Sequence, residues 1–194
     1  MTQPIERFPT PSLDKLPDDI RTRLLAVQEK SGFIPNVFLT LAYRPDEFRA
    51  FFAYHDALME KDGGLTKAER EMIVVATSSA NQCQYCVIAH GAILRIRAKN
   101  PQIADQIAVN YRKADITPRQ RAMLDFAMKV STEAHKISER DFTDIAAMSQ
   151  ASSSAKPCAA SAAKSASEIS SAARLTFMAK SSMARWRCVM SALR

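Results

Sequence analysis

The stretch LTKAEREMIVVATSSANQCQYCVIAH, residues 65–90, decides the fold, because it predicts two consecutive helices joined by a short polar link. Thr66 and Glu69 have the spacing of a capping box, in which each side chain binds the other residue's backbone N–H. A helix is therefore expected to begin at Thr66. Its apolar positions recur three and four residues apart until the pattern fades at residues 78–81.

Helical spacing also dominates the sequence on both sides of this stretch. Asn81 is a suitable N-cap for the helix that follows it. Thr117 and Pro118 have the chemistry of an N-cap and a first helical residue. No convincing strand pattern is found, so the sequence predicts an all-α helical bundle. The predicted helices cover about residues 18–28, 36–43, 45–61, 66–76, 82–98, 102–112, 118–130 and 138–148.

The composition is that of one soluble domain. Of the 194 residues, 47% are hydrophobic and 24% are charged, which excludes a wholly disordered or fibrous protein. No apolar run approaches the roughly 18 to 20 residues that span a bilayer. The first residues have neither the basic region nor the apolar region of a secretory leader. We therefore expect a cytoplasmic protein that does not act at a membrane.

The positive charge is concentrated at one end of the chain. The net charge is +7, but residues 149–194 contain seven Lys and Arg against the single acid Glu168. Residues 1–148 keep 20 basic and 19 acidic residues and lack the basic face that phosphate binding needs. No nucleic-acid partner is expected.

The same boundary separates two kinds of sequence. We expect a helical domain at residues 1–148 and an atypical basic tail at residues 149–194, which contains 12 Ser and 12 Ala and no apolar stripe. The tail is either a low-complexity segment or a stretch translated out of frame, because TCN serine codons become Phe, Leu, Ile or Val codons in the frame shifted by two bases. Resequencing the coding DNA distinguishes these two interpretations.

Two of the four cysteines form a motif. Cys83 and Cys86 make a C-x-x-C, and His90 follows four residues after Cys86. On a helix these spacings place the three side chains on neighbouring parts of one face. In a cytoplasmic helical protein such a pair is typical of redox or metal chemistry.

The sequence lacks the further motifs that the two alternatives to a redox pair require. A structural zinc site needs two further ligands, and neither Cys158 nor Cys188 belongs to a second C-x-x-C. A thioredoxin-type site needs a βαβ pattern, which is absent. We therefore expect no metal and no cofactor, and assign no role to Cys158 and Cys188.

Thiol chemistry explains why these residue types occur together. Peroxide cleavage needs a thiolate and a proton donor or acceptor, and a helix N-terminus together with His90 would favour a thiolate at Cys86. Cys83, one turn away, can condense with the sulfenic acid that results. Glu71 on the preceding helix can exchange protons through a water if the two helices lie side by side.

The segment from Glu71 to His90, with the spacing E-x11-C-x2-C-x3-H, resembles the core motif of the alkylhydroperoxidase D-like proteins of the carboxymuconolactone decarboxylase-like superfamily. From about residue 8 to 148 the chain is similar to the subgroup called uncharacterised peroxidase-related enzymes. The resemblance implies that Cys86 is the peroxidatic thiol, Cys83 the resolving thiol, and Glu71 and His90 the proton relay. It further implies an all-helical homo-oligomer with its active site near a subunit contact.

By this resemblance the protein is a thiol peroxidase that takes a small organic hydroperoxide and a thiol or dithiol electron donor. A helical oligomer that senses redox state or binds a partner without turnover is the alternative. A decarboxylase is a third, but such relatives generally lack the paired cysteines. The chain departs from the family at Tyr85, where the best-studied members have His, and after residue 148, where they continue with apolar helices.

Other polar residues in the helices have ordinary interpretations. His55 lies on an apolar stripe and is expected to pack there, and His135 lies at a helix end. The basic residues Arg95, Arg97 and Lys99 are expected to form a solvated face.

Overall fold

The structure is a computed structural model that describes residues 10–61 and 64–151. Residues 152–194 lie outside the described residues, and with them Cys158, Cys188 and most of the Ser/Ala-rich tail. The two interpretations of that tail therefore remain predictions.

The prediction of an all-α fold is confirmed, since no strand occurs in the described part of the chain. Short 3-10 helices at Leu13–Lys15, Tyr111–Lys113 and Ala134–Lys136 accompany the α-helices. The α-helices are α1 (Asp18–Ser31), α2 (Asn36–Ala42), α3 (Pro45–Met59), α4 (Lys67–Ala80), α5 (Gln84–Ala98), α6 (Ile103–Asn110), α7 (Pro118–Thr132) and α8 (Glu139–Ala151). No helix among the described residues is long and apolar enough to cross a membrane.

The described residues fall into two compact units that divide between Ala57 and Leu58. The first unit has its own small core, formed by Leu16, Ile20, Leu24, Ala42, Phe48 and Phe52. Its His55 is partly buried, lies against the ring of Phe51 and is hydrogen-bonded to Asp56. The prediction that His55 packs on the apolar stripe is thus confirmed.

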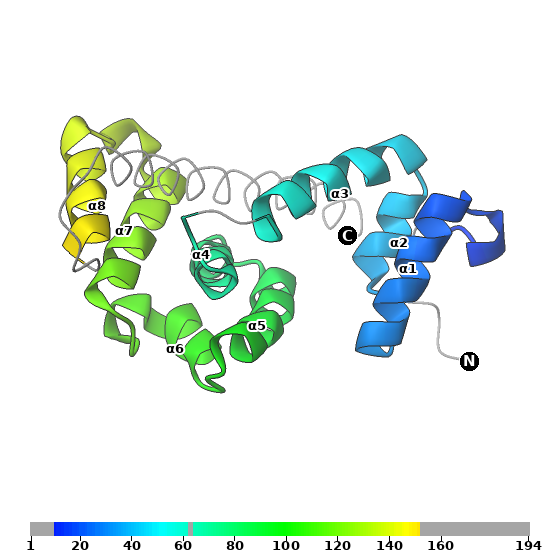
Figure 1. Ribbon diagram of the computed structural model, residues 1–194, viewed down its shortest axis with the longest axis horizontal. Coiled ribbons are helices and arrows are strands. Elements are labelled where there is room, and N and C mark those ends of the chain that lie inside the picture. Colours follow the sequence, from blue (N-terminus) through cyan, green and yellow to red (C-terminus); the bar gives the residue numbers. More distant parts are fainter. Residues whose placement is uncertain (1–9, 62–63, 152–194) are drawn as a thin grey trace. The chain divides into compact units, whose positions relative to one another are not determined.

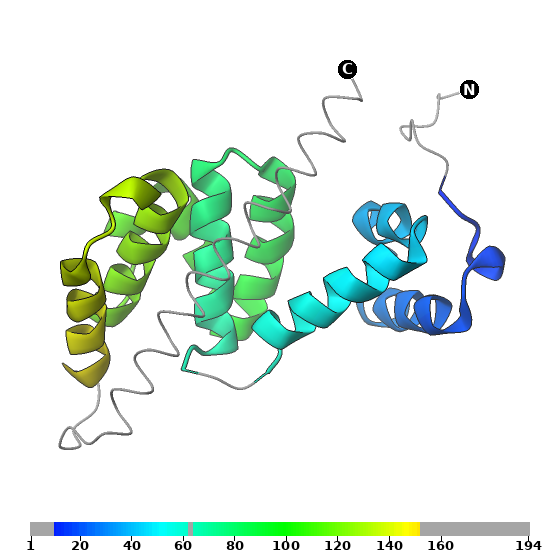
Figure 2. The ribbon, with the colours of Figure 1, turned by 90° about the horizontal axis from the view of Figure 1, so that it is seen from above.

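The second unit is built around α4. Residues 69–78 of this helix are all buried, and the helix packs against α5, α6 and α7. Figure 1 looks nearly along the axis of α4, with these three helices around it, and Figure 2 shows α4 and α5 side by side. A helix buried on every side explains why its apolar pattern is nearly continuous rather than confined to one stripe.

Local signals at the start of α4 and α7 are confirmed. The Thr66 side chain accepts from the backbone N–H of Glu69, and the Glu69 side chain accepts from that of Thr66. Thr117 and Gln120 form the equivalent capping box at the start of α7, with Pro118 in the first helical position. The start of each of these two helices is set by a pair of side chains three residues apart, so the sequence alone suffices to predict it.

The link between α4 and α5 differs from the prediction. Helix α4 continues to Ala80, and Asn81 ends that helix instead of capping α5. The amide of Asn81 donates to the carbonyl of Thr77 at 2.7 Å and to the hydroxyl of Ser131, on α7, at 3.1 Å. A partner 50 residues away decides the role of Asn81, and Cys83 takes the N-cap position instead.

Gln82 completes this link in a left-handed backbone conformation, with φ of 55°. Residues other than glycine adopt that conformation at a cost of roughly 1–2 kcal/mol. The conformation turns the chain sharply, so that α5 begins immediately after α4 ends. The two helices therefore form a tight hairpin with Cys83 at its turn.

Replacing Thr66 by Ala removes half of the capping box at the start of α4. We expect the free energy of unfolding to fall by about 1 kcal/mol, as is typical for a lost N-cap. Chemical denaturation of Thr66→Ala measures the change. Thr132→Ala is the matched control, because its hydroxyl binds the Met128 carbonyl within α7 and caps nothing. Equal effects of both substitutions would contradict the assigned role of Thr66.

Candidate functional site

Cys83 and Cys86 lie at the first turn of α5, where Cys83 is the N-cap residue. Both are free thiols and partly buried. Their Sγ atoms are hydrogen-bonded at a separation of 2.8 Å. The structure thus brings together the two thiols that the C-x-x-C spacing predicts to be neighbours.

The electrostatic environment of Cys86 differs from the prediction of a low-pKa thiol. Burial first, and then the adjacent Cys83 thiol, raise the pKa of Cys86 to about 12. The Ser78 hydroxyl and the Cys86 backbone N–H act in the opposite direction, as a helix N-terminus should, but they are outweighed. At neutral pH Cys86 is therefore a neutral thiol and needs a base to remove its proton.

Glu71 and His90 form the second half of the site. Glu71 lies on α4 with a side chain only 2% exposed, and its Oε2 is 2.8 Å from Nδ1 of His90 on α5. A carboxylate can only accept at this contact, so Nδ1 carries the proton and donates it. The other ring nitrogen, Nε2, is then free to accept a proton.

The thiol pair and the Glu71–His90 pair are neighbours without a direct hydrogen bond. Among the described residues, none joins His90 to either sulfur. Cys86 and His90 are one turn apart on α5, which puts their Cβ atoms roughly 5–6 Å apart. A water molecule can bridge polar groups across such a gap.

Arg97 belongs to the same site, although its sequence context indicated a solvated face. Its Nη1 forms an ion pair with Oε1 of Glu71 at 3.0 Å without hydrogen-bond geometry, and its Nη2 donates a hydrogen bond to Oε1 of Glu60 at 2.6 Å. Its side chain is 22% exposed. The prediction of a solvated face is wrong for Arg97, because the two acids that bind it lie 26 and 37 residues earlier in the chain. Arg95 fits the prediction better, since it binds the exposed Asp105.

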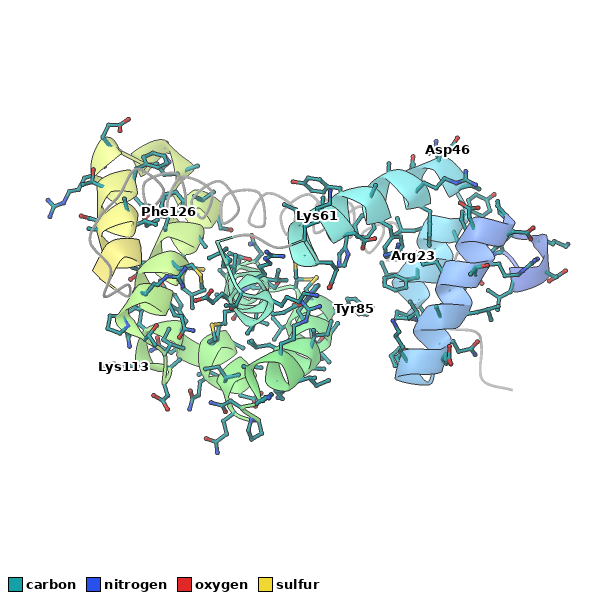
Figure 3. All side chains as sticks on the ribbon, in the orientation of Figure 1. Arg23, Asp46, Lys61, Tyr85, Lys113 and Phe126 are labelled. Atoms are coloured by element: carbon teal, nitrogen blue, oxygen red, sulfur yellow. The ribbon has the colours of Figure 1, made fainter. Side chains whose placement is uncertain are left out.

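Two more residues modify the site. Ser78 is fully buried and lowers the pKa of Cys86, whereas its sequence context, at the fading end of a helical pattern, does not indicate a role in the site. Tyr85, labelled in Figure 3, is 43% exposed, and burial raises the pKa of its phenol. Tyr85 therefore stays neutral near pH 7 and cannot replace a titrating histidine.

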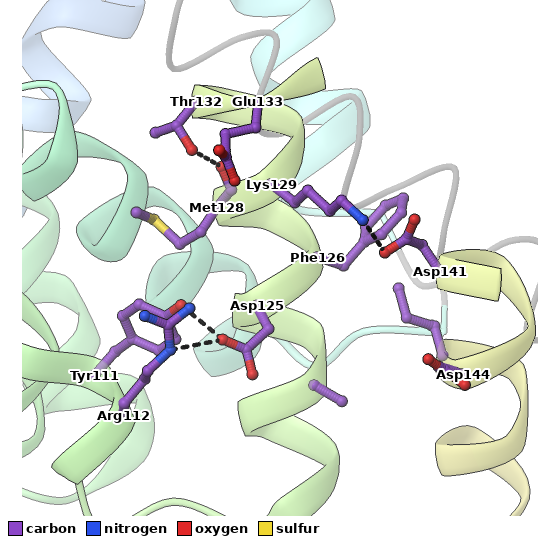
Figure 4. Close-up of a pocket in the computed structure, with 12 residues that line it drawn as sticks. Tyr111, Arg112, Asp125, Phe126, Met128, Lys129, Thr132, Glu133, Asp141 and Asp144 are labelled. Atoms are coloured by element: carbon purple, nitrogen blue, oxygen red, sulfur yellow. Dashed lines mark hydrogen bonds and ion pairs between the residues drawn. The ribbon is translucent and has the colours of Figure 1, made fainter. Parts of the chain in front are cut away.

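No group of three or more His, Cys, Asp or Glu side chains in the described residues could hold a metal ion. A hollow of about 620 Å³ lies beside α7 and α8, lined by residues that include Tyr111, Asp125 and Lys129 (Figure 4). Asp125 accepts from Tyr111, and Lys129 binds Asp141, so these polar groups already have protein partners. None of the four predicted site residues lines this hollow.

Comparisons with known proteins agree with the motif. The pattern of the Carboxymuconolactone decarboxylase family matches residues 45–129. A solved structure from Ralstonia eutropha, described as an alkylhydroperoxidase AhpD core and an uncharacterized peroxidase-related protein, is 58% identical. The match covers 97% of this chain and 91% of that one, with a TM-score of 0.81. The chain belongs to the alkylhydroperoxidase D-like group of the carboxymuconolactone decarboxylase superfamily.

Other relatives of this alkylhydroperoxidase D-like chain are more distant. An uncharacterized peroxidase-related protein from a Silicibacter species is 33% identical, with a TM-score of 0.77 and coverage of 93% of this chain and 89% of that one. Human Sestrin-2 is 32% identical over 62 residues, which are 32% of this chain. The matched segment spans only 13% of Sestrin-2, so that likeness concerns a small part of a longer protein.

The environment of Cys86 predicts how two substitutions change its reactivity. Cys83→Ala removes a group that raises the pKa of Cys86, so Cys86 should be alkylated faster by iodoacetamide at neutral pH. Ser78→Ala removes a group that lowers the pKa, so alkylation should slow. While the pH is below the pKa of Cys86, lowering that pKa by one raises the thiolate fraction about tenfold.

Mass spectrometry of the peptide containing Cys86 follows its alkylation separately from that of the other cysteines. Circular dichroism checks that both variants remain folded. Equal alkylation rates in Cys83→Ala and the unmodified chain would contradict the assigned influence of Cys83.

Proposed function

We propose that the protein is a thiol peroxidase that reduces small organic hydroperoxides. The observation that carries the proposal is the hydrogen-bonded pair of free thiols, with Sγ atoms 2.8 Å apart, beside His90 and the buried Glu71 that it contacts. Cys86 is the peroxidatic thiol, Cys83 the resolving thiol, and Glu71 and His90 the proton relay.

In the first step the Cys86 sulfur attacks one peroxide oxygen as its proton passes to Nε2 of His90. The O–O bond breaks, the alkoxide takes the proton from His90 and leaves as an alcohol, and Cys86 becomes a sulfenic acid. Because Cys86 is a neutral thiol, attack requires this local base. Glu71 stabilises the His90 imidazolium that forms in between.

In the second step the Cys83 sulfur attacks the Cys86 sulfur. The S–O bond breaks, water leaves with the Cys83 proton, and the two residues are joined by a disulfide. A disulfide bond is about 2.05 Å long, so the thiols need to approach by less than one ångström. A thiol or dithiol donor then reduces the disulfide and is itself oxidised.

The same proposal includes the setting of the reaction. We place the protein in the cytoplasm, where reducing systems supply electrons to such a pair. The active chain is a homo-oligomer, as the family resemblance implies. Likeness to proteins described as peroxidase-related supports the reaction class, while the superfamily's name shows that decarboxylases belong to it too.

One observation favours a second candidate, a redox sensor without useful turnover. A thiol with a pKa of about 12 reacts slowly unless the relay acts on it, and slow oxidation suits a sensor better than a scavenger. The two functions differ in whether hydroperoxide consumption continues when a reductant is supplied.

The peroxidase half-reaction is tested with the reduced full chain and one equivalent of tert-butyl hydroperoxide. We expect two thiols per chain to be lost, one equivalent of alcohol to form, and peptide mapping to find the Cys83–Cys86 disulfide. Cys86→Ser should abolish the reaction. The double variant Cys158→Ser/Cys188→Ser is the matched control and should react like the unmodified chain.

Excess dithiothreitol then separates the two candidates. Continued consumption of hydroperoxide supports the peroxidase, and a single slow stoichiometric oxidation supports the sensor. Unchanged consumption by a folded Cys86→Ser protein would refute both.

A further inference from the structure

Arg97 stands out among the basic residues of α5 because two acids, Glu60 and Glu71, contact it. It follows His90 by seven residues, about two helical turns, and so lies on the same side of α5 as His90. Within the described ranges, the side-chain partners of Arg95, two residues earlier, are the exposed Asp105 and the carbonyl of Pro101. The contacts of Arg97 are therefore specific to its position rather than a general property of this end of α5.

The two oxygens of Glu71 have different partners. Oε2 accepts from His90, and Oε1 pairs with Arg97. A carboxylate that is 2% exposed needs such partners, because the loss of hydration destabilises an unpaired ion strongly.

Arg97 also contacts a second acid, Glu60. Glu60 accepts from Arg97 through Oε1 and from Lys67 through Oε2, both at 2.6 Å. The hydrogen bond from Lys67, followed by that from Arg97, lowers the pKa of Glu60, which is therefore ionised. These contacts form a row of alternating charge, Lys67, Glu60, Arg97 and Glu71, which ends at His90, the proposed base.

We propose that Arg97 is a positioning residue for the proposed peroxidase reaction. It binds Oε1 of Glu71 and so keeps Oε2 directed at Nδ1 of His90, which leaves Nε2 as the nitrogen that receives the Cys86 proton. The planar fork of arginine matches this task, because Nη1 forms an ion pair with Glu71 at 3.0 Å while Nη2 donates a hydrogen bond to Glu60. A lysine keeps the charge but has no such fork. This inference rests on the proposed function only for its kinetic consequence.

The first readout does not depend on activity. The chain has three histidines, so nitrogen-15 NMR of the full protein can resolve the tautomer of His90, with His90→Gln giving the assignment. In the unmodified chain we expect the proton on Nδ1. Arg97→Met should give a mixture of tautomers, because Glu71 is then free to turn away from His90. Arg95→Met is the matched control and should leave the tautomer unchanged.

The second readout is the single-turnover rate of thiol loss with tert-butyl hydroperoxide. We expect Arg97→Met to slow it by about tenfold or more, part of the roughly 10²- to 10⁴-fold that a general base contributes. Arg97→Lys should recover only part of the rate, and Arg95→Met should retain it. If Arg97→Met does not fold, the tautomer and the rate are measured in Arg97→Lys and Glu60→Gln instead. Both variants keep a cation next to Glu71 but change how that cation is held, so the positioning role predicts a change in each.

A normal His90 tautomer and a normal rate in folded Arg97→Met would overturn the assignment, as would normal values in both Arg97→Lys and Glu60→Gln. An unmodified chain that consumes no hydroperoxide would refute the proposed function instead. The tautomer measurement would then still test the positioning role by itself.

Discussion

The burial of Glu71 is the constraint on which the second unit depends. Its carboxylate lies within a helix that is buried for ten consecutive residues, where an unpaired ion would be strongly destabilised. Both side chains that pair with it come from α5, His90 from the middle of that helix and Arg97 from its last turn. Polar contacts therefore hold α4 against α5 as well as apolar ones, and the same contacts place His90 beside the thiols.

The tight link between α4 and α5 fixes the position of the two thiols, which lie at the other end of α5 from Arg97. Asn81 ends α4 by bonding to Thr77 and to Ser131 of α7, and Gln82 adopts a left-handed conformation before Cys83. These features fix where α5 begins and hence where the two thiols lie relative to Ser78 on α4. A longer or looser link would separate Cys86 from the buried hydroxyl that favours its thiolate.

Sequence reasoning succeeded where the deciding partners are close in the chain. The capping box at Thr66 needs only a residue three positions away, the N-cap at Thr117 only the proline that follows it, and the C-x-x-C pair only one helical turn. It failed where the partner is distant, as for Asn81 with Ser131 and for Arg97 with Glu60 and Glu71. Glu71 is an intermediate case, because its spacing alone is that of an ordinary helical glutamate and only the family motif singled it out.

The proton transfer from Cys86 to His90 avoids placing a net charge in a partly buried site. Ionising Cys86 by releasing its proton to bulk water would leave a new charge in a site that disfavours it, which is why its pKa is raised. Transfer to His90 leaves the total charge of the site unchanged, because an imidazolium appears as the thiolate does. The charges of Lys67, Glu60, Arg97 and Glu71 cancel when His90 is neutral, so the protonated ring is the one uncompensated cation of this row. The imidazolium lies one helical turn from Cys86. It forms when the thiolate forms, and it stabilises the thiolate by its opposite charge.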